Sequence, residues 1–115
     1  MNIKINTVGD ISVVYINGKV LQENILTFKN KLLNLVEDGI VNIVVDLVDS
    51  DYLSSLGLAT IVEIKKKVNA IGGDVKLSRI NKLVRNLLEV TNLAKIFETF
   101  NDVDTAVKSF DFLKI

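Results

Sequence analysis

The apolar positions of the chain change their spacing several times, and each change predicts a new element of secondary structure. Apolar and polar residues alternate along residues 2–16 around Gly9-Asp10, which predicts a β-hairpin with a type II′ turn. Residues 40–45 form a nearly unbroken apolar run, rich in β-branched side chains, that is typical of a strand covered on both faces. Apolar residues three and four positions apart predict helices over residues 23–37 and after Ser55. The first half of the chain therefore predicts the order strand, strand, helix, strand, helix.

The second half continues this alternation after a turn at Gly72-Gly73. Residues 75–78 predict a strand, residues 81–90 a helix and residues 95–100 a short fifth strand. A last helix follows, and we expect Asn101 to cap its first turn. Helical spacing assigns the inward positions of the second and third helices, which are Leu58, Ile61, Val62, Val68, Ile71, Leu83, Val84, Leu87 and Leu88.

The predicted order of elements fixes the class of fold. Three β-α-β units, each joining parallel strands through a helix, predict a mostly parallel sheet with right-handed crossovers. We therefore expect a single α/β domain over residues 1–115, with a five-stranded sheet, an antiparallel N-terminal edge strand and about four helices. The apolar tail at residues 112–115 is expected to pack back on the domain or to meet a partner.

The composition excludes several classes of function. Since the chain contains no histidine and no cysteine, it lacks a Ser-His-Asp triad, a cysteine nucleophile and an ordinary zinc site, although carboxylate-only Mg²⁺ or Ca²⁺ sites stay open. Lysine plus arginine and aspartate plus glutamate both number 14, so the positive surplus that non-specific nucleic-acid binding needs is missing. Glycine-rich phosphate loops are absent as well. We expect a binding protein that is not an enzyme and uses no metal or cofactor.

Residue types also bear on where the protein works. No apolar run approaches the roughly 20 residues needed to span a bilayer. The N-terminal residues 1–10 do not contain the apolar core of a signal peptide, and the lack of cysteine fits a reducing compartment. We therefore expect a cytoplasmic protein without membrane insertion.

Two adjacent serines, Ser54 and Ser55, stand where the strand at residues 40–45, closed by Asp46, leads through a loop to the next helix. The first amides of a helix lack intrahelical partners, and the helix dipole places partial positive charge there. A serine hydroxyl caps these amides well, and a phosphate is accommodated better still. From the residue types alone, either serine is an N-cap only, or it can carry a phosphate without melting its helix.

The loop before the serines is acidic, and an apolar residue follows them. Asp49 and Asp51 are a polar surface turn in the simplest interpretation, but a phosphate added beside them would concentrate negative charge. A like-charged pair about 4 Å apart costs about 4 kcal/mol at an effective dielectric constant of about 20. Leu56 either packs inward or stays exposed beside Leu53, where a small apolar patch would suit an interface that phosphate switches off.

The stretch from Asp46 to Leu58 resembles the signature of the STAS family, the anti-sigma factor antagonists and their relatives. The family pattern is roughly D-L-S-x-V-x-[FY]-[IM]-[DS]-S-[SA]-G-L. Matches occur at its opening, its aromatic–aliphatic pair, its two serine positions and its close, which are Asp46-Leu47, Tyr52-Leu53, Ser54-Ser55 and Gly57-Leu58. The resemblance extends over essentially the whole chain, including residues 82–97. It departs from the family at Leu21, where the family has an acid, and at Leu56, where it has serine or alanine.

The resemblance implies a binding protein that phosphorylation switches off. An ATP-using serine kinase of the anti-sigma type would bind the Ser55 face and phosphorylate Ser55, with Ser54 as second choice. The unmodified protein would sequester this kinase and release a sigma factor, a PP2C-type phosphatase would reset the switch, and the chain would have no catalytic residue of its own. A monomer or weak dimer is expected. The expected partner-binding residues are Asp46, Asp51, Leu53, Ser54, Ser55, Leu56 and Gly57.

Two other functions stay open beside this one. A STAS module that is never phosphorylated would act as a constitutive adaptor in a transport or signalling complex. A receiver-like protein would accept phosphate on Asp46 instead. Receivers, however, need a paired acidic cluster and a lysine that residues 6–10 and 99–101 do not supply.

Overall fold

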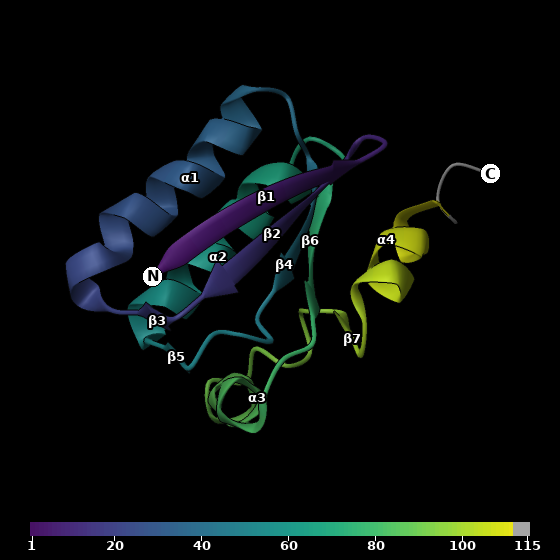
Figure 1. Ribbon diagram of the computed structural model, residues 1–115. Helices are drawn as coiled ribbons and strands as arrows, with labels where there is room; N and C mark the ends of the chain where they lie inside the picture. Colours follow the sequence, from purple (N-terminus) through teal and green to yellow (C-terminus); the bar gives the residue numbers. More distant parts are fainter. Residues whose placement is uncertain (112–115) are drawn as a thin grey trace.

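The computed structural model describes residues 1–111, which fold into a five-stranded sheet flanked by helices (Figure 1). The strands of the sheet are β1 (Asn2–Val8), β2 (Ile11–Asn17), β4 (Asn42–Asp46), β6 (Asp74–Ser78) and β7 (Thr99–Phe100). They lie in the order β1-β2-β4-β6-β7, with β1 antiparallel to β2 and every other neighbouring pair parallel. This arrangement confirms the predicted α/β fold with an antiparallel N-terminal edge strand.

Helices cover both faces of the sheet. They are α1 (Ile25–Glu37), which follows a short 3₁₀ helix η1 (Gln22–Asn24), then α2 (Ser55–Asn69), α3 (Lys82–Val90) and α4 (Val103–Asp111). Figure 1 shows α1 and α2 on one side of the sheet, α4 on the other, and α3 beyond one end of the strands. The larger core, on the side of α1 and α2, includes Phe28 and Ile43, and the smaller core under α4 includes Val44 and Phe110. Strand β4 therefore contributes side chains to both cores, as its nearly unbroken apolar run predicts.

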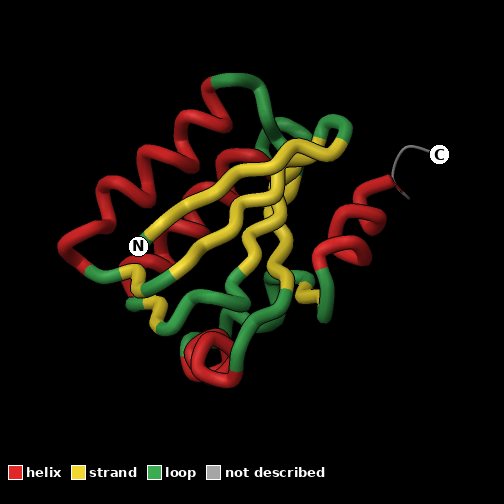
Figure 2. The backbone as a smooth tube through the Cα atoms, in the orientation of Figure 1, coloured by secondary structure: helices red, strands yellow, loops and turns green. Residues whose placement is uncertain are grey.

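Two further strands, β3 (Lys19–Val20) and β5 (Tyr52–Leu53), form a separate parallel pair beside the main sheet (Figure 2). The alternation of residues gives no sign of this pair, because two residues show no period. The Ser54 amide extends the contact by donating to the Val20 carbonyl at 3.0 Å. The pair therefore fixes the position from which α2 starts.

The N-terminal hairpin is confirmed, with its second strand one residue longer than predicted. Strands β1 and β2 pair from Asn2 opposite Asn17 to Val8 opposite Ile11, so Gly9-Asp10 forms the turn. Gly9 has a φ of 63°, and Asp10 does not adopt a positive φ, which fits the expected type II′ turn rather than type I′.

The fifth strand is shorter than predicted, because residues 95–98 precede β7 without strand structure. The reason lies at the end of α3, where Asn92 adopts a left-handed φ of 61° and the Leu88 carbonyl accepts hydrogen bonds from two amides beyond the helix. The chain then turns instead of extending, and the turn directs Phe97 into the larger core.

The sequence predicts that Asn101 caps helix α4, but the capping residue is Asp102. The helix begins at Val103, so the N-cap position falls on Asp102, whose Oδ1 accepts a hydrogen bond from the Thr105 amide at 2.7 Å. The Thr105 hydroxyl donates to Oδ2 at 3.0 Å, and these bonds together hold the pKa of Asp102 below its ordinary value. The expected packing of the tail at residues 112–115 lies outside the described residues.

Two residues predicted to face the core are largely exposed. Ile71 is 61% exposed, because α2 ends at Asn69 and Ile71 lies in the turn that follows, outside the helix. Leu83 is 50% exposed, because α3 buries only Val84 and Leu88. The other predicted inward positions are buried or half-buried, namely Leu58, Ile61, Val62, Val68, Val84, Leu87 and Leu88.

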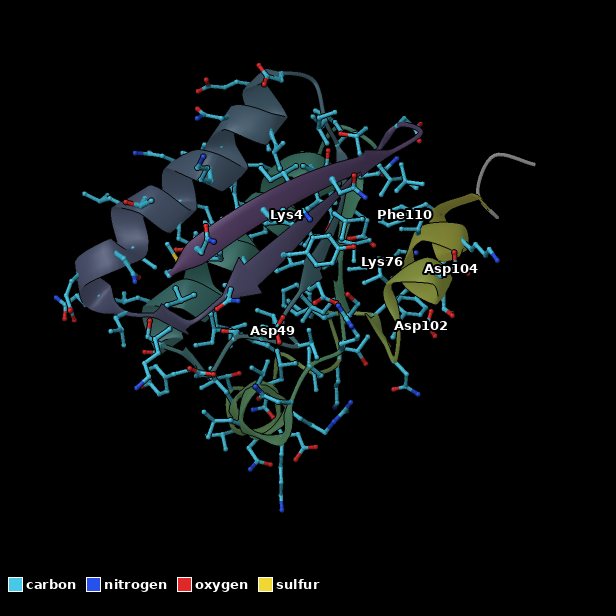
Figure 3. All side chains as sticks on the ribbon, viewed as in Figure 1. Lys4, Asp49, Lys76, Asp102, Asp104 and Phe110 are labelled. Carbon is cyan, nitrogen blue, oxygen red and sulfur yellow. The ribbon has the colours of Figure 1, made fainter. Side chains whose placement is uncertain are left out.

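One buried charge lies under α4. The Lys76 side chain, on β6, is 3% exposed, and its Nζ lies 2.8 Å from Ser109 Oγ and 3.5 Å from the Glu98 carboxylate. The same ammonium lies 4.4 Å from the centroid of the Phe110 ring (Figure 3). The Lys76 side chain therefore contacts α4 with its ammonium as well as with its aliphatic stem.

Lys76→Met is expected to change the free energy of unfolding by less than about 1 kcal/mol, because methionine keeps the aliphatic stem and removes a charge that is costly to bury. Lys76→Ala is the matched control and should cost about 2 kcal/mol, since it leaves a cavity under α4. Urea unfolding of both variants measures the difference. An equal loss in the two would show that the ammonium, and not the stem, holds α4 in place.

Candidate functional site

The turn from β5 into α2 places the two serines in different roles. Ser54 is the N-cap residue, with an extended backbone, and its Oγ accepts a hydrogen bond from the Gly57 amide at 3.1 Å. Ser55 is the first residue of the helix and is exposed, and no described residue hydrogen-bonds to its hydroxyl. Ser54 therefore caps the helix, while Ser55 presents its hydroxyl to solvent.

The first turn of α2 packs closely against the β3–β5 pair. A Cβ at Gly57 would lie 2.7 Å from Leu53 Cδ1 and 2.9 Å from Val20 Cγ1, so a larger residue would displace the helix or the pair. Leu53 is itself only 3% exposed. Leu53 and Gly57 therefore pack underneath the two serines and present little surface to a partner.

Asp46 ends β4 and is buried rather than presented to a partner. Its carboxylate is 1% exposed and accepts hydrogen bonds from Ser78 Oγ at 2.7 Å and from Arg79 Nε and Nη2 at 2.8 and 3.1 Å. The hydrogen bonds to Asp46 raise the pKa of the Arg79 guanidinium above its ordinary value. Asp46 thus ties the ends of β4 and β6 together.

Neither Ser78 nor Arg79 stands out in the sequence, since each is an ordinary polar residue after an apolar run. A usable signal exists nonetheless, because adjacent parallel strands end at the same edge of a sheet. The register places Asp46 opposite Ser78, so the acid that closes β4 meets the residues that close β6. The burial and pairing of this carboxylate argue against a receiver-like phosphate acceptor at Asp46.

Hydrogen bonds from other parts of the chain hold the loop between β4 and β5 in place. The Asn81 side chain donates to the Ser50 carbonyl at 2.8 Å, and the Gly18 amide donates to the Asp49 carbonyl at 2.9 Å. Ser50 is buried, while Asp49 and Asp51 are exposed. The loop therefore holds two acidic residues at the surface just before the serines.

The expected partner-binding residues divide into an exposed and a buried group. Asp51, Ser55 and Leu56 are exposed, Leu56 to 47%, and Ser54 is half-buried. The buried group consists of Asp46, Leu53 and Gly57. The structure therefore leaves four of the seven residues on the open side of the corner, and these four are called the serine corner below.

An apolar groove of about 390 Å³ separates the serine corner from α3. This α3 groove is lined by Tyr52, Leu53, Ser55, Leu83, Asn86, Leu87 and Val90. Ser55 is the lining residue that α2 contributes, so its hydroxyl belongs to the groove wall. Helical spacing assigned Leu83 to the core together with Leu87, which is half-buried against it, so the sequence did not predict a groove here.

Within residues 1–111, histidine, cysteine, aspartate and glutamate side chains form no group of three or more that could hold a metal ion. In that same part of the chain, no helix combines the length and the apolar character that crossing a membrane requires.

Comparison with known proteins finds similarity to several anti-sigma factor antagonists. The anti-sigma-B factor antagonist of Bacillus subtilis is 31% identical over 97 residues, which cover 84% of this chain and 80% of that protein. A candidate anti-sigma factor antagonist of Bordetella bronchiseptica, BtrV, is 24% identical over 110 residues, which cover 96% of this chain and 95% of that protein. The crystal structure of a candidate anti-sigma factor antagonist from Thermotoga maritima matches with a TM-score of 0.88 at 26% identity, covering 93% of this chain and 92% of that one.

A family model, that of the STAS domain, matches residues 2–106. The match includes every element from β1 to the start of α4, and with them the serine corner. It confirms the resemblance inferred from the motif between Asp46 and Leu58. The chain therefore belongs to the STAS domain family.

Proposed function

We propose that this STAS protein is an anti-sigma factor antagonist whose binding is switched off by phosphorylation of Ser55. The observation that carries the proposal is the arrangement of the two serines, in which Ser54 caps α2 and Ser55 exposes its hydroxyl beside the cap. The relatives support the coarser part of the proposal, since one of them is the anti-sigma-B factor antagonist of Bacillus subtilis.

The contacts of the two serines favour Ser55 as the modified residue. Ser54 is half-buried and its Oγ already accepts a hydrogen bond from the Gly57 amide, so a kinase reaches it less readily than the exposed Ser55 hydroxyl. Phosphate on Ser55 leaves this cap in place. It also lies in the first turn of α2, where free amides and the helix dipole favour an anion.

The added charge would act on the partner rather than on the fold. A phosphate brings about −1.5 to −2 charge. Exposed carboxylates precede it at Asp49 and Asp51, and the exposed Leu56 side chain follows it. A partner surface docked here would therefore meet either like charge or an anion that it must strip of water.

The proposed partner is an anti-sigma factor that is itself an ATP-using serine kinase. The unmodified chain would hold this kinase so that a sigma factor is released, and phosphorylation of Ser55 would end the contact until a PP2C-type phosphatase removes the phosphate. The residues of the serine corner, Asp51, Ser54, Ser55 and Leu56, are the proposed contacts. In this cycle the chain is a cytoplasmic binding partner and a substrate, and it performs no catalysis.

Ser55→Asp is expected to weaken binding to the anti-sigma factor by about tenfold or more, because it places a permanent negative charge beside Leu56. Ser55→Ala should bind like the wild type and accept no phosphate. Thr7→Asp is the matched control, since Thr7 is exposed next to the hairpin turn and receives the same charge away from the serine corner. Isothermal titration of each purified anti-sigma factor of the host with these variants gives the affinities.

Intact-mass measurement and peptide mapping of the protein purified from its host, under growth and under stress, test the modification directly. A single phosphate on Ser55 that changes with condition supports the switch. No phosphate in any condition, together with unchanged binding by Ser55→Asp, would contradict the switch and favour a constitutive STAS adaptor.

A further inference from the structure

Helix α3 carries two apolar stripes, and only one of them is fully buried. Val84 and Leu88 face inward and are each 1% exposed. Leu83, Leu87 and Val90, spaced by four and three positions, line the α3 groove instead. Leu83 is 50% exposed and Val90 82% exposed. Leu83 and Val90 therefore contribute little to the stability of this chain, whereas the half-buried Leu87 also packs against the larger core. The spacing of the three residues is that of a contact face.

The opposite wall of the groove comes from the serine corner and from β5. Tyr52 is 43% exposed there, and Ser55 completes the wall. None of the lining residues carries a charge. From Leu83 to Val90 the α3 wall extends for about two helical turns, or about 10 Å. The groove is thus long enough for several aliphatic side chains that project from one face of a partner helix.

We infer that the α3 groove receives aliphatic side chains from a helix of the anti-sigma factor, and that phosphorylation of Ser55 acts by placing a charge in the wall of this apolar groove. The inference rests on the proposed function and names the apolar half of its interface. The groove is continuous with the Ser55 surface, which a kinase must cover in order to reach the hydroxyl. An apolar wall of two turns also matches the stripe of an amphipathic helix laid along it.

A phosphate on Ser55 and an aliphatic side chain in the groove would exclude each other. The lining residues include no lysine or arginine, so a phosphate covered by the partner would lack a counter-charge. Only the Asn86 amide and the Tyr52 hydroxyl could donate hydrogen bonds to it from the lining side chains. The groove is therefore suited to an apolar occupant when Ser55 is unmodified and to water when it is phosphorylated.

Leu83→Asn and Val90→Asn test the groove without disturbing the core, because both side chains are largely exposed. Each is expected to lower the affinity for the anti-sigma factor by about tenfold, as the loss of one buried aliphatic side chain predicts. Ile71→Asn is the matched control. Ile71 is an apolar residue with 61% exposure, beyond the C-terminal end of α2 and hence at the far end of that helix from Ser55. This variant should bind like the wild type.

The same titrations separate failure of the inference from failure of the proposed function. A loss of affinity in Val90→Asn, but not in Ile71→Asn, supports the groove. If both groove variants bind like the wild type while Ser55→Asp loses affinity, the switch stands and the inference is overturned. If Ser55→Asp also binds like the wild type, the proposed switch has failed and the inference with it. Sedimentation of the chain alone tests a different occupant, because a dimer that Val90→Asn dissociates would assign the groove to a second copy and overturn the inference.

Discussion

Gly73→Ala is expected to lower the free energy of unfolding by about 4 kcal/mol, because a methyl group has no room at this position. A Cβ built there would overlap the carbonyl oxygen of Val41 and lie 2.6 Å from its carbonyl carbon. These are backbone atoms, which cannot rotate aside as the end of a side chain can. The substitution must therefore move one of two backbone segments.

Hydrogen bonds hold both of these segments in place. The Gly73 amide donates to the Val68 carbonyl at 2.8 Å, at the end of α2. The Asp74 amide donates to the Val41 carbonyl at 3.0 Å, where β6 begins to pair with β4. Moving Val41 away from residue 73 would break the second of these bonds, and moving residue 73 would break the first.

Gly72→Ala separates this packing effect from strain in the backbone. Gly72 has a φ of 90° and open space around the position of a Cβ, so alanine should cost only about 1–2 kcal/mol of left-handed strain. Urea unfolding of both variants beside the wild type gives the comparison. If Gly73→Ala proves as stable as Gly72→Ala, the close approach to Val41 does not constrain the fold.

The two glycines also show how far the sequence predicts the fold. The hairpin of β1 and β2 and the strand β4 were predicted because their apolar positions follow a regular pattern over several residues. The turn at Gly72-Gly73 was predicted from the two adjacent glycines. The sequence does not reveal which glycine needs a left-handed backbone and which needs space. That difference depends on Val41, which is distant in sequence and reaches Gly73 only in the folded chain.

The candidate site shows the same limit. The motif located Ser54 and Ser55 at the start of α2, but only the structure shows that the Gly57 amide donates its hydrogen bond to the Ser54 hydroxyl. Helical spacing cannot distinguish Leu88, which is buried, from Leu83, which lines the α3 groove, because both positions are apolar and both repeat at helical intervals. From the sequence alone, the residues of the proposed interface therefore look like additional core positions.

Arg79→Ala is expected to lower the free energy of unfolding by about 3 kcal/mol, because it leaves the Asp46 carboxylate buried without its counter-charge. Two of the three short hydrogen bonds that Asp46 accepts come from Arg79. Without them, the Ser78 hydroxyl at 2.7 Å and the more distant Val48 amide at 3.4 Å would remain as donors. Asp46 is only 1% exposed with Arg79 in place, so the guanidinium, and not water, is what now neutralises its charge. Urea unfolding of the variant measures the loss.

Asp46→Asn provides the control for this interpretation. Asparagine keeps the shape of the side chain but carries no charge, so adding Asp46→Asn to Arg79→Ala removes the uncompensated charge. The double variant should therefore be more stable than Arg79→Ala alone, by about 1 kcal/mol or more. A double variant that is less stable than Arg79→Ala would show that the buried charge is not the cause of the loss.

The backbone of Arg79 adds a second effect that can be measured separately. Its φ of 49° lies in the left-handed region, which glycine adopts without strain. Arg79→Gly should therefore be more stable than Arg79→Ala by about 1 kcal/mol, although both variants lose the same ion pair. The chain keeps an arginine where glycine would relieve strain, so the contact with Asp46 is expected to stabilise the fold by more than the strain costs. If Arg79→Gly were as stable as the wild type, the ion pair would only balance that strain, and the join between β4 and β6 would depend on Ser78 and the sheet hydrogen bonds alone.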